Sequence, residues 1–402
     1  MDEGAAGGVG QRVAALRKLL GLKQHQLATA AHVSMSLVKK VEAGHAPASP
    51  SFTAACAKAF GVEVTVLTGQ PYEELTVDTR QDFAGIPELR RALDRYDAPE
   101  VDGPVWDAVR LRAALDEGEA LRRRGRYTLM TERLPLLLQH LYANLAESST
   151  ADATEAAHAL LGDAYSLVAA IAYRFGYLDL TALARDRMSH SARRSGDPLR
   201  VAVAQFFRST LQLHRGDYDL GMRCVDRALA LAGEQGTPEG LAVVAQLHLR
   251  QAIFEARRGN GREADSHIDE ARGLVARGVP AYPYFQVSSN RANVEIHSVA
   301  VPVEMSDGTT AVARAERTHL PVEGLKEDAT RIGHHHIDVA RAWVLHGDRE
   351  KALRSLYTAR AVSPQQTRYH PAVRETLHAI AAADRRATDS LAGFARWAGV
   401  KV

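Results

Sequence analysis

The chain has 402 residues, of which 46% are hydrophobic and 24% are charged, and its formal net charge at pH 7 is +2. This length exceeds one ordinary hydrophobic core and predicts several domains or an array of repeats. The near-neutral charge gives no whole-chain argument for or against a nucleic-acid partner. Aromatic residues make up only 6%, while alanine and leucine dominate, which favours an all-α fold.

The cysteines and the chain start narrow the class of protein further. Cys56 and Cys224 lie far apart in separate helical patterns, so they form neither a disulfide framework nor a CxxC metal site. This usage indicates a reducing cytoplasm. No apolar run approaches the roughly 20 residues needed to span a bilayer, so no membrane partner is expected. Residues 1–9, rich in glycine, are predicted to be a disordered leader and not a signal peptide.

Residues 10–70 are predicted to form a domain of five short helices. The fourth helix begins at Ser49–Pro50, a capping residue followed by proline at the first helical position, and stops at Gly61. The second and third lie back to back within residues 24–44, joined by only three residues. The five helical sequences are QRVAALRKLL, QHQLATAA, SMSLVKKVEAG, PSFTAACAKAF and EVTVLTG.

The third of these helices has a face that the small domain core does not need. Ser34 can cap it, and its exposed side chains are Met35, Ser36, Lys39 and Lys40. Lysines near one face supply phosphate contacts, and short polar or flexible side chains at a helix start can approach base edges. The residues predicted to form the core beneath it are Leu27, Ala31, Val38 and Val41.

This pattern resembles the helix-turn-helix of the Cro/CI-type (Xre) repressor family. The matching motifs are L-x-Q-x-x-L-A at residues 22–28 and V-S-x-S-x-V-x-x-V-E-x-G at residues 33–44, and the similarity covers residues 11–68. The resemblance implies a sequence-specific DNA-binding transcriptional regulator. The predicted DNA-contacting residues are Gln24, Ser34, Met35, Ser36, Lys39 and Lys40.

The resemblance also implies a role for each contact. Gln24 would cap onto a DNA phosphate, and Met35, Ser36 and Lys40 would face bases. Lys39 would contact the DNA backbone by its position and charge. Because Met35 and Ser36 cannot make bidentate base contacts, sequence specificity would depend largely on Lys40 and on DNA shape.

Two residues depart from the family pattern. His32 stands at the turn position that is usually glycine, so it must accept a left-handed conformation or alter the turn. Lys23 replaces the usual Ser or Thr cap. Residues 1–70 contain seven Lys and Arg against four Asp and Glu, a net charge of +3. This modest charge favours a homodimer that presents two such helices to a pseudo-palindromic double-stranded operator. The alternative is a small packing module for protein contact.

Residues 71–104 carry the prolines and glycines of a linker, with one short helix at PELRRALDRY, and residues 105–402 repeat themselves. Three copies have a glycine, a small residue five positions later and an alanine twelve positions later. Gly216 and Gly259 are 43 residues apart and Gly259 and Gly347 are 88 apart, so a cryptic unit with its turn at Ser306 is expected between them. Weaker copies lie near Gly125 and Gly176.

These repeats resemble tetratricopeptide repeats and predict a helical solenoid, although their spacing exceeds that family's roughly 34 residues. The alternative is a generic helical bundle. Residues thirteen and nine positions before each turn share one helix face, and stacking aligns them into a polar stripe. Tetratricopeptide-like proteins hold peptides on this face, and long-repeat versions behind a helix-turn-helix resemble the quorum-sensing peptide receptors of the Rgg/PlcR/PrgX group. The ligand-groove candidates are Gln246, Arg250, Asn293, His297, His334 and Asp338. A solvated helix face is the alternative.

The sequence gives no sign of catalysis. The run GHHHID at residues 333–338 places consecutive imidazoles about 100° apart, so they do not converge on a metal ion. No motif of a protease, hydrolase or nucleotide-binding enzyme is present, so neither a catalytic residue nor a cofactor is expected. The favoured hypothesis is a cytoplasmic homodimeric regulator whose repeats sense a small molecule, peptide or protein. The alternative is a protein-interaction adaptor or antitoxin-like scaffold.

Overall fold

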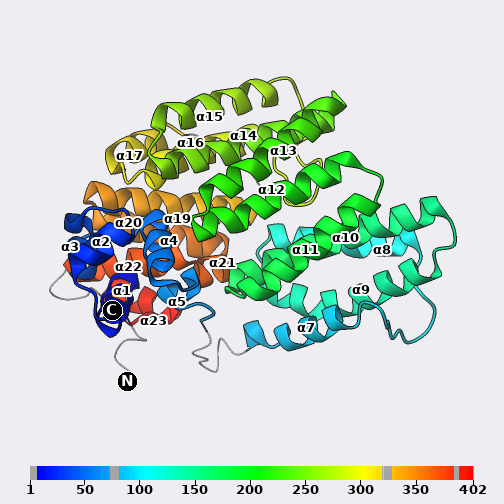
Figure 1. Ribbon diagram of the computed structural model, residues 1–402, viewed down its shortest axis with the longest axis horizontal. Coiled ribbons are helices and arrows are strands. Elements are labelled where there is room, and N and C mark those ends of the chain that lie inside the picture. Colours follow the sequence, from blue (N-terminus) through cyan, green and yellow to red (C-terminus); the bar gives the residue numbers. More distant parts are fainter. Residues whose placement is uncertain (1–6, 73–80, 319, 321–327, 384–388, 402) are drawn as a thin grey trace.

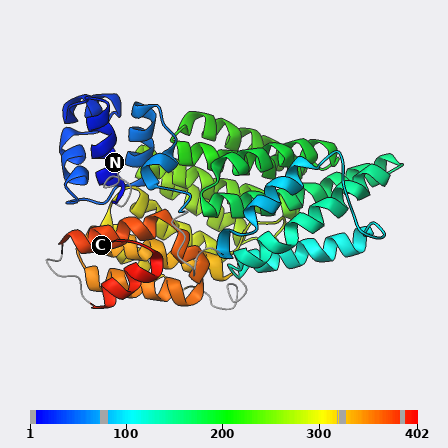
Figure 2. The ribbon, with the colours of Figure 1, turned by 90° about the horizontal axis from the view of Figure 1, so that it is seen from below.

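The computed structural model describes residues 7–72, 81–318, 320, 328–383 and 389–401. Within these ranges every regular element is a helix and no strand occurs, which confirms the all-α prediction. Figures 1 and 2 show a small group of N-terminal helices at one end of the molecule, beside the C-terminal helices, with the remaining helices stacked away from them.

Five short helices form the N-terminal domain, as predicted. Their apolar side chains meet in one core that includes Val13, Leu27, Val38, Val41 and Phe52. The helices are α1 (Val9–Leu19), α2 (Gln24–Ala30), α3 (Met35–Glu42), α4 (Pro50–Phe60) and α5 (Val64–Thr68).

The segments before and after this domain include buried helical residues, in contrast to the predicted leader and linker. Of the predicted leader, residues 1–6 lie outside the described residues, whereas Val9 is buried and begins α1. In the predicted linker, residues 73–80 also lie outside the described part, and α7 covers Ile86–Asp94. Helix α7 buries Leu89 and Leu93 against α9, so this part of the connection belongs to the core of the repeats.

The remainder of the chain is a succession of packed helices, consistent with a helical solenoid. The helices are α8 (Ala108–Arg123), α9 (Tyr127–Glu147), α10 (Ala151–Phe175), α11 (Leu178–Arg194), α12 (Pro198–Arg215), α13 (Tyr218–Gln235), α14 (Pro238–Arg258), α15 (Gly261–Val275), α16 (Arg291–Glu304), α17 (Gly308–Arg317), α19 (Ala329–His346), α20 (Arg349–Val362), α21 (Pro364–Tyr369), α22 (Pro371–Ala383) and α23 (Asp389–Ala398).

The helices pair into hairpins at the turns that the repeat pattern predicts. Gly176, Gly216, Gly259 and Gly347 each have a positive φ, between 74° and 99°, which L side chains rarely adopt. Ser306, at φ 61°, takes the same place between α16 and α17. The cryptic unit is therefore present, with serine at its turn.

The small residues of the repeat let neighbouring hairpins approach closely. A Cβ atom at Gly221 would lie 2.2 Å from the ring of Phe254 on α14. The corresponding alanines of the other units, Ala264 and Ala352, are fully buried. This spacing therefore sets the distance between neighbouring helices.

The array closes on itself. Helix α19 contacts α8, and α21 contacts α10, so helices far apart in the sequence meet. The backbone N–H of Tyr127 donates to Oε1 of Gln365 at 2.6 Å, and the rings of Phe175 and Tyr369 lie 5.3 Å apart. Helices from the first and last hairpins consequently surround one interior.

Helix α10 has the length and apolar composition to cross a membrane. No apolar run of that length was expected from the sequence. The most apolar stretch of α10 is largely buried inside the fold, where the helix packs against α9 and α11. Its apolar character is thus accounted for by the core of the array.

Candidate functional site

The turn between α2 and α3 is tight because His32 adopts the left-handed conformation, with φ at 53°. Sequence analysis left open whether this residue would do so or alter the turn. Ser34 then caps α3, its Oγ accepting from the backbone N–H of Leu37 at 3.1 Å. The cap and the turn together fix the start of α3 relative to α2.

Helix α3 exposes the predicted face. Ser34, Met35, Ser36, Lys39 and Lys40 are all exposed, and Met35 retains 44% of its accessible surface. Neither lysine pairs through its ammonium group with any other described residue. Figure 1 shows α3 at the outer edge of the molecule, and the exposure of these side chains means that the other described residues leave this face uncovered.

Gln24 occupies a different environment from the other predicted contacts. It is half-buried, and its Nε2 donates to Oε2 of Glu42 at 2.8 Å. Arg17 also donates to both oxygens of Glu42, at 2.6 and 2.9 Å. The amide of Gln24 has a second hydrogen for a phosphate oxygen, while the first joins α2 to α3.

This network also sets the charge of Glu42. Burial alone would raise the pKa of Glu42, but the hydrogen bonds from Arg17 and Gln24 hold it below its usual value. Glu42 is therefore ionised at neutral pH. Through Arg17 and Gln24 it ties α1, α2 and α3 into one unit.

Comparison with known proteins agrees with this geometry. Residues 9–67 match a family described as helix-turn-helix domain. Residues 9–67 form a helix-turn-helix domain. This family binds DNA, which supports a DNA-binding regulator. The match ends before the array, so the resemblance of the repeats to tetratricopeptides stays a prediction. No curated protein matches the chain.

The helix-turn-helix domain rests on two distant parts of the array. At one, the backbone N–H of Val9 donates to Oε1 of Glu375 on α22 at 2.8 Å. At the other, a Cβ atom at Gly216 would lie 2.9 Å from Cβ of Ala54 on α4. Glu375 is half-buried at this contact, and burial raises its pKa to about 7.

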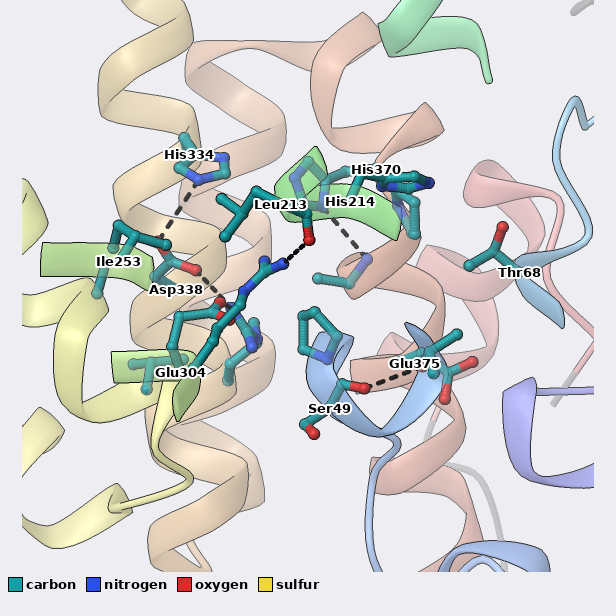
Figure 3. Close-up of a pocket in the computed structure, with 18 of the residues that line it drawn as sticks. Ser49, Thr68, Leu213, His214, Ile253, Glu304, His334, Asp338, His370 and Glu375 are labelled. Carbon is teal, nitrogen blue, oxygen red and sulfur yellow. Dashed lines mark hydrogen bonds and ion pairs between the residues drawn. The ribbon is translucent and has the colours of Figure 1, made fainter. Parts of the chain in front are cut away.

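A cavity of about 380 Å³ lies between the helix-turn-helix domain and the array. Ser49 and Thr68 line it from the domain, and His214, Glu304 and His370 line it from the array (Figure 3). An adjoining cavity of about 190 Å³ lies among the array helices. The two share seven lining residues: Tyr173, Arg174, Thr210, Arg250, His297, Arg331 and His334.

The structure brings the six groove candidates together on α14, α16 and α19. Nδ2 of Asn293 donates to Oε1 of Gln246 at 3.1 Å, which links neighbouring units. Asn293 is buried and is not among the lining residues of either cavity. The candidates that line the larger cavity are Arg250, His297, His334 and Asp338, and those that line the smaller one are Gln246, Arg250, His297 and His334.

One wall of the larger cavity is fully ion-paired. Oε2 of Glu304 accepts from Arg257 at 2.7 Å, and Oε1 accepts from Arg341 at 2.9 Å. Burial alone would raise the pKa of Glu304, but the two arginines hold it at about 2. His334 lies 3.6 Å from Asp338, yet burial lowers the pKa of its ring well below the usual value. The imidazole is therefore neutral at pH 7.

Part of this lining was not predicted from the sequence. Residues six and two positions before each turn also face the cavity, continuing the face that begins thirteen positions before the turn. Extending the count by these two offsets would have found them. They are Thr210 and His214, Ile253 and Arg257, Ala300 and Glu304, and Arg341 and Leu345.

Proposed function

We propose that the chain is a sequence-specific transcriptional regulator that binds a pseudo-palindromic operator as a homodimer, and whose repeats sense a small molecule, peptide or protein. The observation that carries the proposal is the exposed face of α3, in a helix-turn-helix domain that also lines a cavity with the array. The cytoplasm is the proposed location.

In the DNA complex, α3 lies in the major groove. Lys39 contacts phosphates, and Met35, Ser36 and Lys40 approach base edges. The side chains of these four residues are exposed, so they reach DNA without local unfolding. One domain with a net charge of +3 makes few phosphate contacts, and a second copy doubles them.

Sensing is proposed from the position of the larger cavity. Its lining includes residues of both the helix-turn-helix domain and the array. A ligand that fits this cavity better in one arrangement of the two parts shifts the protein toward that arrangement. Because half-site spacing is a strict geometric demand, such a shift alters the affinity of a dimer for its operator.

The DNA-binding part is tested with fluorescence anisotropy on DNA from upstream of the gene, over a series of KCl concentrations. The variant with Lys39→Ala and Lys40→Ala should bind more weakly. Its dependence of log affinity on log salt should flatten by about 0.9 for each DNA phosphate that the variant no longer neutralises. Lys58→Ala, on α4 and outside the α2–α3 motif, is the matched control. Wild-type affinity and salt slope in the double variant would refute the role of Lys39 and Lys40. Absence of salt-dependent DNA binding by the wild type would instead support a protein-interaction adaptor.

A further inference from the structure

The smaller cavity also indicates what kind of ligand the array binds. We propose that it holds a small organic anion, through a carboxylate or phosphate group bound by Arg185, Arg250 and Arg331. This inference rests on the proposed sensing role of the array and specifies the ligand class. The smaller cavity is called the arginine cavity below.

The arginine cavity carries many positive charges and few negative ones. Among the described residues, Asp328 is the only carboxylate that lines it, and its Oδ1 already accepts from Thr330 and from a backbone N–H. Arg122 is paired with Glu119. No ion pair with a described residue is made by the other arginines of the lining, which are Arg174, Arg185, Arg250 and Arg331.

Two of these guanidinium groups stack on aromatic rings and not on carboxylates. Arg185 lies 3.9 Å from the ring centroid of Phe207, and Arg250 lies 4.7 Å from that of Phe206. The two rings are 4.9 Å apart and nearly perpendicular. Stacking holds the faces of the guanidinium groups. Nη1 of Arg185 donates to Sδ of Met188 at 3.4 Å, and because thioether sulfur is a weak acceptor, the N–H edges suit a stronger one.

Several buried hydrogen-bond donors around the cavity have no acceptor. Nε of Arg250, Nε of Arg331 and Nε2 of Gln366 are buried without a partner. Buried donors normally have acceptors, and leaving them unmet costs stability. Carboxylate and phosphate oxygens are strong acceptors and suit guanidinium edges, so an anion satisfies both the charge and the hydrogen bonds.

Burial of the charged guanidinium groups of Arg185 and Arg250 costs stability. Burial and the neighbouring Arg250 lower the pKa of Arg185 to about 9, and burial lowers that of Arg250 to about 10. Both side chains are still charged at pH 7. Arg185 is only 8% exposed, so solvent screens it little.

The position of the arginine cavity connects the anion to the helix-turn-helix domain. Arg174, Arg250 and Arg331 line both cavities, so the two spaces adjoin at the arginines. The charged group of the ligand would lie on the arginines, and its organic remainder would extend into the larger cavity. There it meets Ser49 and Thr68 of the helix-turn-helix domain.

The experiment measures binding to the full-length protein by calorimetry and by thermal unfolding. Inorganic pyrophosphate represents phosphate ligands and citrate represents carboxylate ligands, each compared with KCl at the same ionic strength. At least one probe should raise the unfolding temperature of the wild type. Arg250→Gln and Arg331→Gln should each weaken its binding by about tenfold or more. Arg258→Gln is the matched control, because Arg258 pairs with Glu255 and Asp219 and lines neither cavity.

A second measurement separates a ligand site from a structural role. Without anion, Arg250→Gln should unfold at the wild-type temperature or above it, since it removes an unpaired buried charge. The proposal is overturned if neither probe stabilises the wild type beyond KCl, or if both arginine variants bind the probe as the wild type does. DNA binding through Lys39 and Lys40 is measured separately. The proposal of DNA binding therefore stands even if no anion binds. An anion that binds without changing DNA affinity would count only against the proposed sensing.

Discussion

The buried ion pair between Arg17 and Glu42 positions the DNA-binding helix, and Glu42→Gln tests this directly. The side chains of Arg17 and Glu42 are only 10% and 6% exposed. In the variant, the guanidinium of Arg17 stays buried without a counter-charge but keeps its hydrogen bond to the carbonyl of Leu22 at 2.7 Å. Breaking a buried pair from one side costs about 3–5 kcal/mol. Because that bond remains, we expect the lower end, about 3 kcal/mol.

Amide hydrogen exchange is the suitable assay, because it reads α1, α2 and α3 separately from the array. A decrease of about 3 kcal/mol corresponds to roughly hundredfold faster exchange in these helices. DNA affinity should fall in parallel, although Glu42 does not lie on the exposed face of α3. Glu88→Gln is the control, since its pair with Arg91 is exposed and worth at most about 1 kcal/mol. Wild-type exchange and DNA affinity in Glu42→Gln would refute the reasoning.

Three further predictions concern stability and are checked by thermal unfolding. The pKa of Glu304 is lowered from 4.5 to about 2. Its ionised form therefore contributes about 3 kcal/mol to the free energy of unfolding, which is present above pH 4.5 and lost as the pH falls toward 2. Glu304→Gln should remove that contribution at pH 7 and most of the pH dependence of stability between pH 4.5 and 2. Gly221→Ala should destabilise the protein by about 1–3 kcal/mol because the new Cβ meets the ring of Phe254, whereas Gly273→Ala, which meets nothing within 4 Å, should stabilise it by about 0.5–1 kcal/mol. His32→Gly should stabilise it by about 1 kcal/mol by relieving the left-handed backbone, and an unchanged or lower unfolding temperature would contradict this.

Local sequence patterns predicted the helix-turn-helix well. Its helices are short and its turn is only a few residues long, so caps and apolar spacing determine nearly all of its geometry. The array could be predicted for a similar reason. The position of each turn determines which residues of the preceding helix share one face. Ser306 and the pairs such as Gln246 and Arg250 were placed by counting from turns. Arg331 lies three residues before His334, so the same helix face could have revealed it.

Contacts between distant segments could not be predicted in this way. The closure of the array joins Tyr127 to Gln365, and no local period encodes a meeting of the first and last hairpins. The arginine cavity depends on that closure, because Arg185 on α11 and Arg331 on α19 face the same space only once the array has curled. The contact between Val9 and Glu375 is equally non-local. The arginine residues that suggest the ligand class are therefore brought together only by the folded array.

The support of the helix-turn-helix domain has a mechanical consequence. One half of that support is the turn at Gly216 and the other is Glu375 on α22, and the hairpins between them determine how far apart the halves lie. A change in the curvature of the array would therefore move the two contacts relative to each other and rotate the helix-turn-helix domain against the array. Substitutions in α14 to α17, far from any nucleic acid, would then alter operator affinity without touching a single DNA-facing side chain.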